Sequence, residues 1–151
     1  MIVYLSLLLK SIFVESNLQT ILNKDVMISI SVNNLNIVEF DFNNILLKMM
    51  SLELNKDLKI GSKVELLVKP TSVAISKKYI ENISLSNQAL AKIVAIENGE
   101  LLSSLSLEIN DTFIESIITK ESSQRLDLQK GDIINILIKA SDLSIYRILN
   151  D

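Results

Sequence analysis

An internal repeat of about 70 residues constrains this chain more than any other feature of its sequence. The segments 57–61 and 127–131 both run from an aspartate to one of the chain's three glycines, at an offset of 70 residues. At the same offset the apolar run 64–68 falls on 134–138, and a lysine follows both runs. A match that keeps glycine, lysine and apolar positions together indicates a duplication. We therefore predict two homologous modules, residues 1–76 and 82–148.

Most apolar residues in both modules alternate with polar ones, which is the pattern of half-buried β-strands. The alternation runs through residues 26–32, 38–42 and 105–109. Residues 64–68 and 133–138 are almost continuously apolar, as expected of strands covered on both faces. About five strands in each half are typical of a small Greek-key barrel. We predict an all-β fold of two OB-like Greek-key β-barrel modules in tandem, and the composition also fits a β-sandwich.

Each module is also predicted to carry one short helix. In the second module the helix covers Lys120–Leu126, with Thr119 as its N-cap. In the first module the helix is expected to be longer, from about Ile45 to Leu54, and one of the two asparagines before it serves as the cap.

Composition excludes several classes of function. The 151 residues include neither cysteine nor histidine, which excludes disulfides, thiolate or imidazole metal sites and the serine triad. The net charge of −3 has the wrong sign for a general nucleic-acid binder, and an aromatic fraction of 5% leaves few platforms for base stacking. No recognisable pair of catalytic carboxylates is present, so we predict a protein that is not an enzyme. The hydrophobic fraction of 48% predicts burial between subunits.

Three polar clusters interrupt the apolar pattern of the second module, at residues 84–88, 118–122 and 139–142. They supply hydroxyls, the ammonium group of Lys139 and the amides of a helix start, all of which donate hydrogen bonds. Donors suit a ligand that only accepts hydrogen bonds, and a helix N-terminus attracts anions. Lys139, at the end of a buried strand, adds a full positive charge. The pattern favours a small oxyanion as ligand.

Each cluster also has a purely structural interpretation. Thr119 and Ser122 suit an N-cap that binds no ligand. Lys139 suits a strand-end lysine whose aliphatic stem lies along the barrel. Residues 84–88 suit a polar linker between the modules. The residues alone leave these alternatives open.

Four motifs follow one another in the second module: Ser84-Leu85-Ser86-Asn87, Ile118-Thr119-Lys120-Glu121-Ser122, Leu128-Gln129-Lys130-Gly131-Asp132 and Lys139-Ala140-Ser141. Through these motifs, in this order, residues 83–145 resemble a molbindin domain, the module also called Mop or the molybdate-binding TOBE domain. Ser86 stands where the family has an arginine, which removes one positive charge.

The first module resembles the same domain more weakly, through Gly61 and Lys69-Pro70-Thr71, so the whole chain resembles a tandem molbindin. Tyr4 and Ser6 are taken as the counterparts of the opening motif. Pro70 replaces the family's alanine and offers no amide, which predicts an incomplete site in this half.

The resemblance implies a protein that binds molybdate or tungstate and needs no cofactor. In the family the anion lies between modules, at subunit interfaces, so a homo-oligomer is expected, either a trimer or a dimer. The implied oxyanion-binding residues of the second module are Ser84, Ser86, Asn87, Thr119, Ser122, Lys139, Ala140 through its amide, and Ser141. Those of the first module are Lys69 and Thr71.

We expect intracellular storage or homeostasis of the anion, with no membrane or nucleic-acid partner. Residues 1–9 are interpreted as a buried strand, because Lys10 interrupts the apolar stretch and no export signal surrounds it; the expected location is the cytoplasm. The alternative is the ligand-sensing domain of a molybdate-responsive regulator or an accessory domain of a transporter. A third class, a barrel for oligosaccharide or single-stranded nucleic acid, is disfavoured by the charge and the few aromatic residues.

Overall fold

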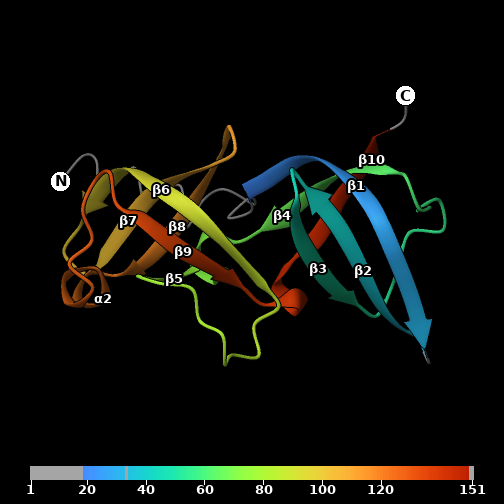
Figure 1. The fold of residues 1–151 in the computed structure, drawn as a ribbon, viewed down its shortest axis with the longest axis horizontal. Helices are drawn as coiled ribbons and strands as arrows, with labels where there is room; N and C mark the ends of the chain where they lie inside the picture. The colour runs from blue at the N-terminus through green and yellow to red at the C-terminus, as the bar shows by residue number, and fades with distance from the viewer. Residues whose placement is uncertain (1–18, 33, 150–151) are drawn as a thin grey trace.

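The strands of the described residues form two five-stranded antiparallel sheets that lie side by side (Figure 1). The computed structural model describes the backbone of residues 19–32 and residues 34–149 in full. The first sheet has the order β10-β4-β1-β2-β3. It consists of β1 (Gln19–Val32), β2 (Leu35–Phe42), β3 (Ile45–Ser51), β4 (Lys63–Val68) and β10 (Ser144–Leu149).

The second sheet has the order β5-β9-β6-β7-β8, and three short helical segments accompany the strands. Its strands are β5 (Ala74–Ser76), β6 (Asn87–Asn98), β7 (Leu102–Ile109), β8 (Thr112–Thr119) and β9 (Ile133–Ile138). The helical segments are the 3-10 turns η1 (Pro70–Ser72) and η2 (Ala140–Asp142) and the α-helix α2 (Lys120–Arg125). Among the described residues, no helix combines the length and hydrophobicity that a membrane span needs.

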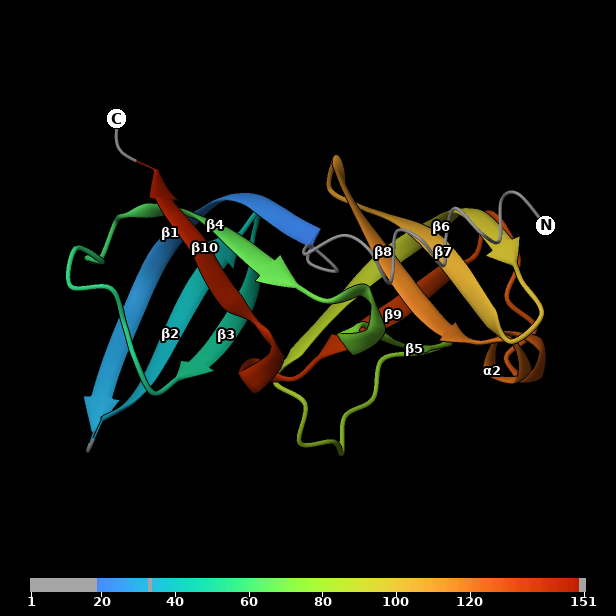
Figure 2. The ribbon, with the colours of Figure 1, turned by 180° about the vertical axis from the view of Figure 1, so that it is seen from behind.

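Each sheet contains one strand from the other half of the sequence. β5 comes from the first half but pairs with β9, where Ile75 lies opposite Ile136. β10 comes from the second half but pairs with β4, where Ile145 lies opposite Leu66. Figure 2 shows both crossings from behind. The limits 1–76 and 82–148 therefore describe the sequence repeat, and neither sheet is built from one of these segments alone.

The all-β fold class is confirmed, but the helix expected from Ile45 to Leu54 is wrong. This segment begins with β3, whose buried residues Leu47 and Met49 alternate with more exposed ones. Asn43 and Asn44, read as helix caps, have φ angles of 48° and 69° and join β2 to β3. Two positive φ angles in a row define the two-residue hairpin turn that asparagine tolerates well. The dipeptide is thus a hairpin turn.

The apolar positions predicted for the strands form the buried interior. Val38, Phe40 and Phe42 of β2 are at most 2% exposed, and they alternate along the strand as the period of two requires. In β9 every residue after Ile133 is buried, which confirms the expectation of a strand covered on both faces.

Candidate functional site

The sheet register brings two of the three predicted polar clusters to the same end of the second sheet. Asn87, the first residue of β6, pairs with Ile138, the last residue of β9. The chain beyond this pair holds exposed donors on both sides. We call this group the linker end. It consists of Ser84, Ser86, Lys139, Ala140 and Ser141.

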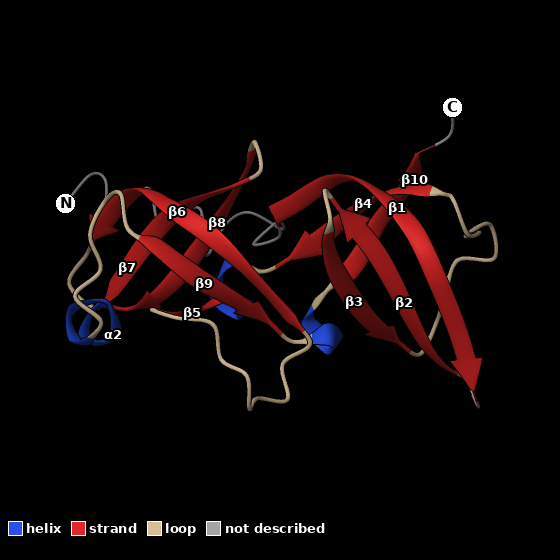
Figure 3. Cartoon of the chain, in the orientation of Figure 1, coloured by secondary structure: helices blue, strands red, loops and turns tan. Residues whose placement is uncertain are grey.

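The third cluster, Thr119 and Ser122, lies at the opposite end of the same sheet, which we call the helix end. Asn98, the last residue of β6, pairs with Ser103, and Ser103 pairs with Ile118. A strand advances about 3.3 Å per residue, so the 12 residues of β6 separate the two ends by roughly 36 Å. Figure 3 shows α2 at the outer end of the second sheet and η2 near the first sheet. One chain therefore does not bring Thr119 and Lys139 together.

The hydroxyls of the helix end already bond to the helix. Thr119 is the N-cap of α2, as predicted, and its Oγ1 accepts from the backbone N–H of Ser122 at 3.2 Å. The same Oγ1 is 2.8 Å from Ser122 Oγ, to which it donates. Arg125 Nη2 also donates to Ser122 Oγ, at 3.2 Å. α2 has only six residues, so its dipole is small. This geometry matches the structural interpretation, in which Thr119 and Ser122 form an N-cap.

Asn87 uses both ends of its side-chain amide within the fold. Its Oδ1 accepts from the backbone N–H of Lys48 at 2.6 Å, and its Nδ2 donates to the carbonyl of Lys48 at 2.9 Å. Asn87 is 1% exposed, whereas its neighbour Ser86 is exposed. The side chain therefore joins the start of β6 to β3 of the other sheet, and its amide is already engaged within the fold.

The first-half candidates lie at the other crossing. Lys69 and Thr71 are exposed and flank the buried Pro70 in η1, which packs against β8. Behind this turn the buried hydroxyl of Ser116 donates to the carbonyl of Val73 at 2.6 Å. The lysine and the hydroxyl thus occupy the same local structure as in η2, but a proline stands between them where η2 has Ala140.

The register gives the first-half residue that is equivalent to Asn87. Gln19 pairs with Val68 as Asn87 pairs with Ile138, so the backbone of Gln19 takes the position of Asn87. Tyr4 and Ser6, which the sequence interpretation favoured, lie outside the described residues, as does the strand expected over residues 1–9.

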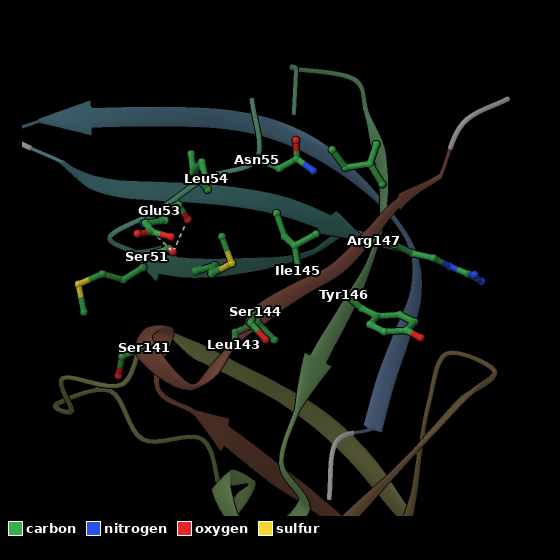
Figure 4. A pocket seen from close by; sticks show the side chains of 13 residues that line it. Ser51, Glu53, Leu54, Asn55, Ser141, Leu143, Ser144, Ile145, Tyr146 and Arg147 are labelled. Carbon is green, nitrogen blue, oxygen red and sulfur yellow. Dashed lines mark hydrogen bonds between the residues drawn. The ribbon is translucent and has the colours of Figure 1, made fainter. Parts of the chain in front are cut away.

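An open cavity of about 290 Å³ separates the two edge strands of the first sheet, β3 and β10 (Figure 4). Ser141 is the only predicted site residue in its lining. Met49, Leu54 and Leu143 make much of its wall apolar. Arg147 also lines it, but its guanidinium already bonds both carboxylate oxygens of Glu65, at 2.7 and 2.8 Å. The cavity therefore offers no unpaired guanidinium to an anion.

A second ion pair holds the start of the linker. Lys77 Nζ lies 3.0 Å from Asp132 Oδ2 and donates to the carbonyl of Asp127 at 2.9 Å. The hydrogen bond from Lys77, and after it the one from the backbone N–H of Gln129, lowers the pKa of Asp132 below its usual value. Within residues 34–149 no three acidic side chains cluster closely enough to hold a metal ion.

Comparison with known proteins agrees with these observations for the second half of the chain. The family model of the TOBE domain matches residues 83–145. This segment is similar to a TOBE domain. The resemblance predicted from the four motifs is thereby confirmed for the TOBE-like segment, and the tandem arrangement stays a prediction. A search of curated proteins gave no match.

A solved structure resembles nearly the whole chain. It is that of the cytoplasmic molybdate-binding protein ModG with molybdate bound. The superposition has a TM-score of 0.77 at 23% sequence identity and covers 84% of this chain and 94% of ModG. At this identity the likeness shows that the two chains share a fold, beyond the limits of the TOBE-like segment.

Proposed function

We propose that this protein binds molybdate or tungstate and stores the anion in the cytoplasm, without catalysing a reaction. The observation that carries the proposal is the register of β6 and β9: Asn87 pairs with Ile138, so the segment that ends in Ser86 and the segment that begins with Lys139 both leave the sheet at this pair. The TOBE match of the same segment supports it, as does a fold shared with a cytoplasmic molybdate-binding protein.

The chemistry of the linker end suits such an anion. Molybdate at neutral pH is a tetrahedral dianion that accepts hydrogen bonds and has no proton to donate. Each hydrogen bond to a charged partner contributes about 1.5–3 kcal/mol, so four or five of them, less the costs of desolvation and ordering, suffice for a micromolar site of about −8 kcal/mol. Asp142 follows Ser141 but is exposed, so solvent screens its charge.

We further propose that the complete site forms between copies of the chain. The helix end lies roughly 36 Å from the linker end along β6, so Thr119 and Ser122 contribute only if another copy supplies them. Exposed apolar residues flank both ends: Leu101 is 73% exposed beside the helix end, and Tyr79 is 63% exposed in the linker. Contact between two different ends fits a closed ring such as a trimer, and it equally fits a two-fold dimer in which the linker end of each copy meets the helix end of the other.

Titration calorimetry with molybdate, tungstate, sulfate and phosphate tests the proposal. We expect the first two anions to bind, and Lys139→Ala to weaken binding at least about tenfold, because it removes the one full positive charge of the site. Lys69→Ala is the matched control, since Lys69 occupies the equivalent strand end in the first half. Equal losses in the two variants would show that the halves contribute alike. Failure of the unchanged protein to bind either metal oxyanion would refute the proposed function.

Light scattering tests the assembly separately. We expect a mass that is a multiple of 16.9 kDa at micromolar concentration. A monomer that nevertheless binds molybdate would place the whole site within one chain, at the linker end, and would refute the shared interface.

A further inference from the structure

A buried polar network lies beneath the linker that joins β5 to β6. Asn135 interrupts the apolar run of β9 and is 0% exposed. Its Nδ2 donates to Gln88 Oε1 at 2.8 Å and to Ser76 Oγ at 3.1 Å. These three side chains come from β9, β6 and β5, so the network spans three neighbouring strands.

The network ends on the backbone of the linker. Gln88 Oε1 accepts from the N–H of Ile80 at 3.2 Å, and Gln88 Nε2 donates to the carbonyl of Ile80 at 2.9 Å. Ser76 Oγ donates to the carbonyl of Lys78 at 2.6 Å. Residues 77–86 form neither helix nor strand, so these side chains supply hydrogen bonds that a regular element would make with its own backbone.

The two amides at the start of β6 act on opposite sides. Successive side chains of a strand point to opposite faces. Asn87 therefore pairs with the backbone of Lys48 in β3, while Gln88 pairs with the backbone of Ile80 in the linker. The strand start is fixed to the other sheet on one face and to the linker on the other.

Stability of the sheet alone does not account for Asn135. Its Oδ1 is buried and has no hydrogen-bond partner within the described structure. An unpaired buried acceptor is unfavourable, and an apolar side chain would suit the core of β9 better. The equivalent position in the first half, Glu65, is also polar and buried, but it bonds to Arg147 of β10. The two halves thus use this position for different partners.

We propose that Gln88 and Asn135 are positioning residues of the oxyanion site, because they hold the linker so that Ser84 and Ser86 stay beside Lys139. This inference rests on the proposed function. Neither residue touches the anion; both act through the backbone of Ile80.

Two variants of matched size test the network. Gln88→Met removes both bonds to Ile80, and Asn135→Leu removes the support of Gln88. Gln124→Met is the control, because Gln124 is exposed on α2. Circular dichroism and a thermal melt identify variants that fold.

Limited digestion with trypsin reads out the linker without any ligand, since Lys77 and Lys78 are exposed within it. We expect cleavage there to be at least about tenfold faster in Gln88→Met and Asn135→Leu, because each loses hydrogen bonds that suppress local opening. Titration with molybdate should show an affinity loss of similar size. The control should match the unchanged protein in both measurements.

Unchanged cleavage in both folded variants would overturn the proposal. Faster cleavage with unchanged molybdate affinity would overturn the role in ligand binding and leave only an anchor for the linker. If the unchanged protein binds no metal oxyanion, the proposed function fails together with the ligand role. Digestion would then still show whether the network holds the linker, so the two failures are distinguishable.

Discussion

β10 comes from the second half of the sequence but belongs to the first sheet, so a substitution in the second half should destabilise the first sheet. Leu143 precedes β10, is 2% exposed and lines the cavity with Met49 and Leu54. Leu→Ala at a buried site costs about 2–5 kcal/mol, more where a closed void remains. At Leu143 the vacated space joins an open cavity of about 290 Å³. We therefore expect Leu143→Ala to lower the free energy of unfolding by roughly 2–3 kcal/mol.

Urea unfolding followed by circular dichroism measures this loss, and hydrogen exchange locates it. We expect a single transition, and faster exchange in residues 35–51, although the substitution is about 100 residues away in sequence. Leu90→Ala is the control, because Leu90 is 62% exposed and its loss should change stability by less than about 0.5 kcal/mol. Faster hydrogen exchange confined to residues 87–138, or two separate unfolding transitions, would refute the pairing of β10 with β4.

Two further predictions concern side-chain bonds at the start of the linker and behind η1. The lowered pKa of Asp132 means that its pairing with Lys77 stabilises the fold above the pKa of the unfolded state and ceases to do so as pH falls through the folded pKa. The difference in urea midpoint between the unchanged protein and Asp132→Asn should thus shrink as the pH is lowered from about 7 to 2, and a constant difference would contradict the assignment. Ser116→Ala should cost about 1–3 kcal/mol in urea unfolding, because it leaves the buried carbonyl of Val73 without its donor; exposed Ser106→Ala should be neutral.

The repeat and the strand pattern could be predicted because both depend on local sequence. Val64–Val68 and Ile134–Ile138 are equivalent in sequence, and the structure gives them equivalent places in β4 and β9. Thr119 was recognisable as a cap because the residues that it bonds follow it directly.

The pairing partners of the last strands could not be predicted in this way. Alternation shows which face of a strand is buried, but either sheet would satisfy the apolar residues of β5 and β10 equally well. The error at Ile45 has a different origin. Asparagine suits both a helix cap and a hairpin turn, and the comparison with Asn110 and Asp111, which form the equivalent turn with φ angles of 44° and 63°, would have distinguished them.

In the candidate site too, local sequence identifies the residues, but it does not determine which of them lie together. The motifs identify residues such as Ser84 and Lys139, whose proximity follows from one strand pair. That Thr119 lies at the far end of β6 depends on the order of four strands, which no local pattern encodes. Asn135 was detectable as a polar residue inside an apolar run, but its partner Gln88 lies 47 residues away in sequence.

The sequence repeat and the pairing of β5 and β10 with the opposite sheets together explain where Lys69 and Lys139 lie. In each half the lysine ends a central strand, and the 3-10 turn after it carries the chain across to the other sheet: η1 packs against β8 and η2 packs against β3. The backbone of such a crossing leaves one sheet and packs against the other, whereas an ordinary hairpin turn joins two strands of the same sheet. Lys139 and Ser141 flank Ala140 within the second crossing, so an anion held there bonds to the segment that ties the sheets together. The first crossing has the same architecture, but Pro70 replaces the amide donor, and this one substitution is enough to make the two crossings chemically unequal.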